Sequence, residues 1–217
     1  MGLRRLGGER VLLDDISLSI RGGDRIAIVG PTGSGKTLLL RSLAELDLLD
    51  AGEIRWQGTP VRGNEIPRFR SQVIYLHQRP TLIEGTVEEN LRQPYSLRVH
   101  QEKQFRRERI VSLLLSLGRD ESFLLKQQRD LSGGESQLTA LLRAIQLNPS
   151  ILLLDEPTAA LDAAAANMVE YLVTTWLGEM PTTRAMVWVT HDHSQALRIA
   201  NRVLEMDAGR MQPRSKI

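Results

Sequence analysis

Apolar positions along this chain follow two periods, one typical of strands and one typical of helices. Residues 11–20 alternate, with Ile16, Leu18 and Ile20 on one face, which predicts a half-buried strand. Residues 25–29 and 151–154 are short apolar runs, as in parallel strands covered on both faces. Strands that alternate with helices indicate an α/β domain. Further strands are predicted at residues 52–58, 73–76, 186–189 and 203–206, and helices at about 36–46, 135–147, 163–177 and 194–200.

The segment from residue 86 to about 117 is more polar and has helical spacing. Three arginines within it form either a binding patch or the solvated face of a helix. The mixed charges around them favour the solvated face. The arginines are Arg106, Arg107 and Arg109, and the apolar side of the helix would carry Phe105, Ile110 and Leu113.

Composition and charge exclude several classes of function. The 217 residues include 28 Lys and Arg against 26 Asp and Glu, too near balance for a nucleic-acid-binding field, so we expect no nucleic acid partner. The absence of cysteine excludes disulfides and thiolate metal sites. No apolar run approaches the ~18 residues that a membrane-spanning helix needs. We therefore expect a chain that is soluble when isolated and reaches a membrane only through a partner.

Residues 30–37 match the pattern G-x-x-x-x-G-K-[ST] between a buried strand and a helix. A strand that turns through glycines into a helix aims several unpaired backbone N–H groups at one point, which attracts phosphate. Lys36 is placed to reach the β and γ phosphates, and the Thr37 hydroxyl suits a Mg²⁺ ligand. The flanking strand and helix argue against a chance glycine-rich turn. The predicted phosphate-binding residues are Gly30, Pro31, Thr32, Gly33, Ser34, Gly35, Lys36 and Thr37.

Asp155 and Glu156 come directly after the apolar run 151–154. Two adjacent carboxylates at the end of a buried strand destabilise the fold unless a cation neutralises their charge or one of them is protonated. Asp155 suits Mg²⁺, usually through a water, and Glu156 suits polarising a water that attacks the γ phosphate. The alternative is an acidic turn before Pro157. Because a phosphate loop is also present, the pair predicts hydrolysis.

Together with the phosphate loop, five further motifs resemble the ATP-binding cassette (ABC) family, in the family's order and over nearly the whole chain. Any one of them alone would be weak. They are Gln78, like the Q-loop; residues 131–135 (LSGGE), like the signature; residues 155–158 (DEPT), like the extended Walker B; residues 160–162 (ALD), like the D-loop; and residues 190–192 (THD), like the switch histidine.

This resemblance implies an α/β P-loop NTPase fold, an ABC-type ATPase core with an antiparallel β subdomain and an inserted α-helical subdomain. It implies one domain over residues 1–217, with the core at 1–78 and 148–217 and the helical subdomain at approximately 79–147. It also implies a Mg²⁺-dependent ATPase that forms a head-to-tail homodimer around two ATP molecules.

The resemblance also assigns roles to single residues. Glu156 and His191 would be catalytic, with His191 contacting the γ phosphate and holding Glu156 and the water in line. Gln78 would be catalytic as well, reaching Mg²⁺ and the attacking water; alone, it would be an ordinary loop amide, as His191 alone would be a structural histidine. The metal ligands would be Thr37, Gln78 and Asp155. The residues that complete the ATP site of the opposite subunit would be Ser132, Gly133, Gly134, Glu135 and Asp162.

Three departures from the family pattern stand out. Arg5 occupies the position of the usual adenine-stacking aromatic. A guanidinium can stack on a base, but without the aromatic the sequence does not predict a preference for ATP over GTP. Only four residues precede Arg5, so the usual preceding strand is either absent or the true start lies upstream. Glu135 stands where glutamine is commonest and Leu138 where a basic residue is usual, for which we expect modest effects on dimer affinity and none on chemistry.

A single cassette without a long insertion resembles the separate ATPase subunit of a membrane transporter. Residues 79–90, 131–135 and 187–191 resemble the ATP-binding subunit of exporters of the FetA/FetB type, associated with iron export. We therefore expect a permease partner and a location on the cytoplasmic side of the cell membrane, held there by that permease. The alternatives are a non-transport cassette that regulates a membrane complex such as the cell-division machinery, and a DNA-associated ATPase, which the charge balance disfavours.

Overall fold

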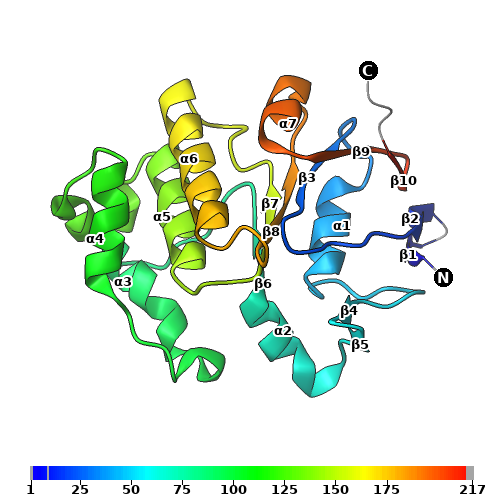
Figure 1. Ribbon diagram of the computed structural model, residues 1–217, viewed down its shortest axis with the longest axis horizontal. Coiled ribbons are helices and arrows are strands. Elements are labelled where there is room, and N and C mark those ends of the chain that lie inside the picture. Colours follow the sequence, from blue (N-terminus) through cyan, green and yellow to red (C-terminus); the bar gives the residue numbers. More distant parts are fainter. Residues whose placement is uncertain (1, 9, 214–217) are drawn as a thin grey trace. The chain divides into compact units, whose positions relative to one another are not determined.

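The computed structural model describes residues 2–8 and 10–213, which form two compact units (Figure 1). The first unit contains the described residues up to Tyr75, together with Ser150–Glu156 and the residues from Met180 onward. The second contains Leu76–Pro149 and Pro157–Glu179, and thus includes α6 (Ala163–Glu179). The domain boundaries predicted from the sequence stay a prediction.

A six-stranded sheet forms the centre of the first unit, and its core strands are parallel. Its order is β10 (Arg210–Pro213), β9 (Arg202–Asp207), β3 (Arg25–Val29), β8 (Ala185–Val189), β7 (Ile151–Asp155) and β6 (Val73–Leu76). β3 pairs in parallel with both β9 and β8, and β8 pairs in parallel with β7, whereas β10 is antiparallel to β9 at the edge. The carboxyl ends of β3, β7 and β8 therefore meet at one edge of the sheet.

Both faces of this sheet are covered, as the continuous apolar runs predict. Ile26 and Ile28 of β3 face the larger core, which contains Leu39 and Leu40 of α1 (Lys36–Leu43). Ala27 and Val29 point to the opposite face, where α7 (His193–Ile199) packs through Ala196. Small side chains on that face let the helix approach the sheet closely. All of these side chains are fully buried.

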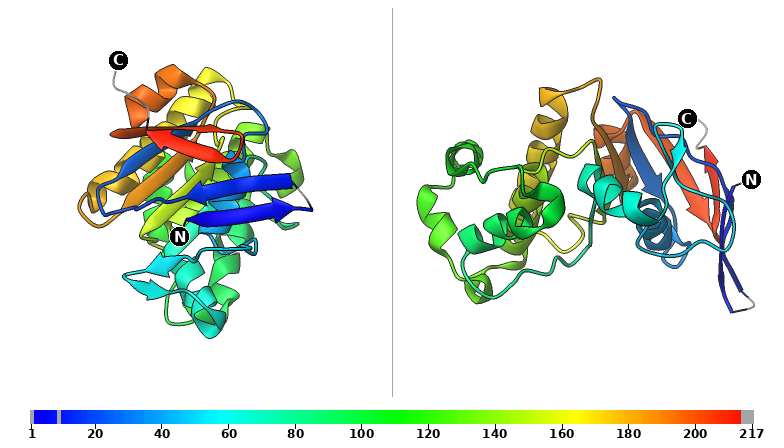
Figure 2. Two further views of the ribbon diagram at one scale, coloured as in Figure 1. Left: turned by 90° about the vertical axis from the view of Figure 1, so that its right-hand side faces the viewer. Right: turned by 90° about the horizontal axis from the view of Figure 1, so that it is seen from below.

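Two antiparallel hairpins complete the first unit (Figure 2). β1 (Leu3–Gly7) pairs with β2 (Arg10–Ile16), and β4 (Arg55–Trp56) pairs with β5 (Thr59–Pro60). β1 contains Arg5, and the prediction that the usual strand before Arg5 is absent or lies upstream stays a prediction. The strand predicted over 11–20 ends at Ile16. Asp15, with a φ of 50°, lies at the register shift between the Leu3–Ile16 and Arg5–Leu13 pairs. The remaining helix of this unit is α2 (Ile66–Gln72).

The second unit is helical. α5 (Gly133–Ile145) packs against α6 and against α3 (Val87–Arg92). The single helical stretch predicted from 86 to about 117 is wrong in its middle, where α3 ends in 3₁₀ turns at Gln93–Ser96 and Arg98–His100 and α4 begins only at Arg107 (Arg107–Ser116). Pro94, which has no N–H to donate, explains the interruption.

The three arginines of this segment lie around the start of α4. Arg106 precedes the helix, Arg107 forms ion pairs with Glu88 and Glu121, and Arg109 forms one with Glu179. The buried face of α4 is formed by Ile110 and Leu114.

Helix length bears on the question of a membrane span. α6, the longest helix of the described residues, has 17 residues. Within residues 2–8 and 10–213, no helix combines the length and apolarity needed to cross a bilayer.

Candidate functional site

The shared edge of the sheet brings together most of the predicted site residues of the first unit. The phosphate loop follows β3, Asp155 ends β7 with Glu156 next to it, and His191 comes two residues after β8. These segments are far apart in the sequence, and parallel pairing of β3, β8 and β7 places them side by side.

The loop at residues 30–37 has a backbone that only glycine accommodates at two positions. Gly30 has φ 148°, and a Cβ there would lie 2.0 Å from the Met206 carbonyl oxygen. Gly35 has φ 102° and precedes α1 directly. Within the described part of the chain, no carbonyl accepts from the backbone N–H groups of Gly33 and Gly35. The loop thus offers unpaired N–H groups beside the amino end of a helix, the arrangement that binds phosphate.

Lys36 is the first residue of α1 and is buried, with 6% of its surface exposed. Its Nζ donates hydrogen bonds to the carbonyl oxygens of Gly30 and Pro31, both at 2.8 Å. Burial lowers the pKa of Lys36, while the nearby Glu156 and Asp155 carboxylates act in the opposite direction. The ammonium group is therefore held inside the loop, next to the two carboxylates.

Asp155 is buried, and each of its carboxylate oxygens accepts a hydroxyl hydrogen bond. Thr37 Oγ1 donates to Oδ1 at 3.1 Å, and the Tyr75 hydroxyl donates to Oδ2 at 2.9 Å. Burial, assisted by the Asp155 charge, raises the pKa of Tyr75, so the phenol remains protonated and can donate. One hydroxyl and one carboxylate in contact fit the Mg²⁺ sites of phosphate-binding enzymes, where the phosphates supply further oxygens.

Sequence reasoning missed Tyr75. The residue lies in β6, the neighbour of β7 in the sheet, so its hydroxyl reaches a carboxylate that is 80 positions away in the sequence. The signal in the sequence was a single tyrosine in the otherwise apolar strand predicted at residues 73–76. In the folded sheet this strand neighbours β7, which ends at the acidic pair.

Glu156 adopts a backbone conformation that is unusual for its residue type. Its φ is 45°, in the left-handed region, and its N–H donates to the Val189 carbonyl oxygen at 3.1 Å. Such a conformation costs about 1–3 kcal/mol and is characteristic of functional sites. Oε2 of Glu156 lies 3.6 Å from Nδ1 of His191, whose side chain is 67% exposed. The structure thus brings together the predicted base and the predicted switch histidine.

The predicted signature residues and Asp162 meet at one cavity of about 300 Å³ in the second unit. Ser132 caps α5, with its hydroxyl accepting from the Glu135 N–H at 3.2 Å. Asp162 Oδ1 accepts from the Ala165 N–H at 2.7 Å at the start of α6. The amino ends of two helices therefore open into the same cavity, which favours an anionic ligand there. The cavity is lined by Arg119, Ser132, Gly133, Gly134, Glu135, Leu138, Ala160, Leu161, Asp162, Ala164, Ala165 and Met168.

Glu135 is the centre of a charged network that the sequence did not predict. Its Oε1 accepts from Lys126 Nζ at 2.8 Å and from Arg119 at 3.0 Å, and its Oε2 accepts from the Ser132 N–H at 3.1 Å. Burial alone would raise the pKa of Glu135, but hydrogen bonds from Lys126, Ser132 and Arg119 outweigh it and lower the pKa to about 2. The residue that departs from the family's glutamine is therefore an ionised carboxylate with two cationic partners.

Glu135→Gln should lower the free energy of unfolding by ~1–3 kcal/mol, because Arg119 and Lys126 lose their charged partner. Urea unfolding measures this loss. Glu89→Gln is the matched control, since Glu89 forms the same capping box with Thr86 but is exposed and, in the part of the chain that the structure describes, has no cationic partner. Equal losses in the two variants would contradict the importance of the network.

Two other predicted residues lie in less specific surroundings. Gln78 is exposed two residues after β6, and it belongs to the second unit. The Arg5 guanidinium donates to the Leu48 carbonyl oxygen and lies 3.9 Å from Asp47. Base stacking by Arg5 and metal contact by Gln78 stay predictions.

Comparison with known proteins identifies relatives over most of the chain. A family model described as "ABC transporter" matches residues 13–159. The "Sulfate/thiosulfate import ATP-binding protein CysA 2" of Chromobacterium violaceum is 39% identical over 97% of this chain and 56% of its own length. The "Probable iron export ATP-binding protein FetA" of Escherichia coli K12 is 34% identical over 95% of this chain and 90% of its own length. The chain thus spans little more than half of the first relative and most of the second.

Solved structures agree with these relatives. The ATP-binding cassette MJ0796, in a dimeric post-hydrolysis structure with ADP and Pi, matches with a TM-score of 0.81 and 27% identity over 100% of this chain and 98% of that one. cbiO1 from Clostridium perfringens matches with a TM-score of 0.80 at 23% identity over 97% and 84%, a likeness of fold alone. The predicted α/β ABC-type ATPase fold is confirmed.

Proposed function

This chain belongs to the ATP-binding domains of the ABC transporter family, and from that membership we propose that it is the ATP-hydrolysing subunit of a membrane transporter. The observation that carries the proposal is the contact of Thr37 with Asp155 at the edge of the sheet where Lys36, Glu156 and His191 also lie. A nucleotide-dependent hydrolase needs these groups together.

In this proposal the phosphate loop and Lys36 bind the phosphates of ATP, because unpaired N–H groups and an ammonium converge there. Thr37 and Asp155 would hold Mg²⁺, which would neutralise phosphate charge. Gln78 is the proposed third contact to the metal.

Glu156 is the proposed base that polarises the attacking water. His191 is proposed to contact the γ phosphate and to orient Glu156, with the 3.6 Å separation of Nδ1 and Oε2 as support. The strained backbone of Glu156, anchored on Val189, supports a functional role for this residue.

We also propose that two copies join head to tail, so that residues 132–135 and Asp162 of one copy complete the ATP site of the other. The cavity they share, at the amino ends of α5 and α6, is suited to an anion. The dimeric MJ0796 structure, which covers the whole chain at 27% identity, supports this arrangement.

The proposed partner is a separately encoded permease in the cell membrane, and the proposed cargo is a metal ion. The name of the E. coli relative, at 34% identity, supports metal export, whereas the sulfate importers of similar identity are named for a different cargo.

Affinity purification of the tagged chain from its native membrane tests the partner. A multi-span permease whose addition makes the ATPase respond to iron supports the proposal. Purification with a cell-division protein, without stimulation of ATP hydrolysis by a substrate, would contradict the proposal.

Tyr75→Phe should raise the Mg²⁺ concentration needed for half-maximal ATP hydrolysis by about threefold to tenfold, with a smaller effect on the maximal rate. The variant removes one hydrogen bond to a charged group, and Asp155 is then oriented by Thr37 alone. ATPase rates at varied Mg²⁺ measure the effect. Tyr171→Phe is the control, since that tyrosine is half exposed on α6. An unchanged Mg²⁺ dependence in Tyr75→Phe would exclude the positioning role.

A further inference from the structure

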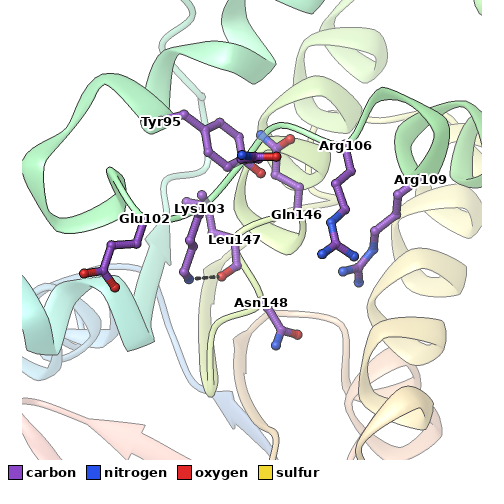
Figure 3. Close-up of a pocket in the computed structure, with 9 residues that line it drawn as sticks. Tyr95, Glu102, Lys103, Arg106, Arg109, Gln146, Leu147 and Asn148 are labelled. Carbon is purple, nitrogen blue, oxygen red and sulfur yellow. Dashed lines mark hydrogen bonds between the residues drawn. The ribbon is translucent and has the colours of Figure 1, made fainter.

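A second, larger cavity of about 440 Å³ opens within the helical unit, at residues to which the proposed ATPase assigns no role (Figure 3). Its walls come from the turn that contains Tyr95, from the segment before α4, from the first turn of α4 and from the end of α5. Every lining residue belongs to the second unit.

The lining carries more positive than negative charge. Lys103, Arg106 and Arg109 face a single acidic residue, Glu102, whose carboxylate points away from both arginines in Figure 3. Arg109 is paired with Glu179 at 3.1 Å. In the described part of the chain, Arg106 has neither an ion pair nor a hydrogen bond from its side chain. Arg106 therefore brings to the cavity a positive charge with which no carboxylate of the described residues pairs.

Lys103 adds to this charge from a more buried position. Its Nζ donates to the Leu147 carbonyl oxygen at 2.5 Å, which uses one of the three ammonium donors. Burial lowers the pKa of Lys103, as expected for a cation without an acidic partner.

The two arginines are arranged to act together. Arg106 precedes α4 as its N-cap, and Arg109 lies three residues later in the first turn of the helix. Figure 3 shows their guanidinium groups side by side and pointing the same way. No side chain caps α4, so the unpaired N–H groups and positive end of this ten-residue helix add to the same field.

The opposite wall is ordered by its own contacts. The Tyr95 ring packs edge to face against Phe105 at 6.0 Å, and the Arg92 guanidinium stacks on Phe105 at 4.3 Å. Gln146 donates to the Leu91 carbonyl oxygen at 2.6 Å, while its buried Oε1 finds no hydrogen-bond partner among the described residues.

We propose that this cavity binds a small phosphate-bearing ligand, with the phosphate held by Arg106 and Arg109. A phosphate has three terminal oxygens and up to two negative charges, which match two guanidinium forks better than one carboxylate does. The site is independent of the proposed ATPase, because none of its residues belongs to the nucleotide machinery.

Calorimetric titration of the Mg-ADP-loaded chain with inorganic phosphate and with pyrophosphate, at constant ionic strength, tests the proposal. We expect saturable binding that Arg106→Gln weakens by at least about tenfold. Arg106 has no side-chain partner within residues 2–8 and 10–213, so its replacement should not disturb folding. Arg98→Gln, which removes an exposed arginine outside the cavity, is the matched control and should change affinity less than twofold.

Further binding measurements distinguish the possible sources of the phosphate. If binding that depends on Arg106 is seen only with phosphatidylcholine vesicles containing phosphatidic acid, the ligand is a lipid headgroup and the site stands. If Arg106→Gln and Arg98→Gln weaken phosphate binding equally, the binding depends only on the overall positive charge, and the proposed site is overturned. Binding of poly-glutamate that depends on Arg106, without any phosphate binding, would overturn it in favour of an acidic protein segment.

Discussion

Glu156→Gln should lower ATP hydrolysis by about 10²–10⁴-fold while leaving ATP binding unchanged. Glutamine preserves the size of the side chain but cannot accept a proton from water. The φ of 45° and the hydrogen bond to Val189 are backbone features, so the replacement should keep the local geometry. Phosphate release at saturating ATP measures the rate, and equilibrium titration with ATP measures binding.

The same variant tests the proposed dimer. If the closed dimer opens only after hydrolysis, Glu156→Gln with Mg-ATP should sediment as a dimer under conditions in which the unmodified chain does not accumulate one. Glu205→Gln, at an exposed position of β9 in the same unit, is the control and should behave as the unmodified chain. Full turnover by Glu156→Gln would remove Glu156 from its proposed role as base.

The second carboxylate should behave differently. Asp155 already accepts hydrogen bonds from Thr37 and Tyr75, so its oxygens are directed by the protein, whereas Glu156 faces the exposed His191. One carboxylate is thus arranged to hold a cation and the other to meet a water. The sequence predicts the same division of tasks, and the hydrogen bonds of Asp155 and the neighbouring His191 of Glu156 support it.

Local patterns predicted the parts of this fold that local chemistry determines. The strands at 73–76 and 151–154 and the helix capped by Ser132 were found because apolar runs and capping residues act over a few positions. β1 was missed because its residues are mostly exposed and two of its five are arginines. The break between α3 and α4 was missed because mixed charge resembles a continuous solvated helix.

Contacts between distant segments explain what the sequence could not predict at the site. The bond from Tyr75 to Asp155 depends on β6 being next to β7, and sheet order is not a local property. The network of Glu135 likewise depends on Arg119 and Lys126, which come from the chain that precedes α5. Sequence patterns identified the groups of the site, and tertiary pairing decides which of them touch.

Lys36→Ala should weaken ATP binding by about 100-fold or more, because an ammonium next to the phosphates is lost. Lys36 Nζ also holds the loop through its hydrogen bonds to Gly30 and Pro31. Removing it therefore affects both the charge and the shape of the loop. Equilibrium titration with ATP and with AMP distinguishes these effects, because AMP lacks the β and γ phosphates that Lys36 is proposed to contact.

Arg68→Ala is the control for this replacement. Arg68 is a cationic side chain in the same unit as Lys36, but it is exposed on α2 and has no role in the proposed site. Lys36, in contrast, lies beside Asp155 and Glu156. If Lys36→Ala keeps its ATP affinity, or if Arg68→Ala loses as much, the lysine does not act on the phosphates, and residues 30–37 would no longer be assigned to ATP.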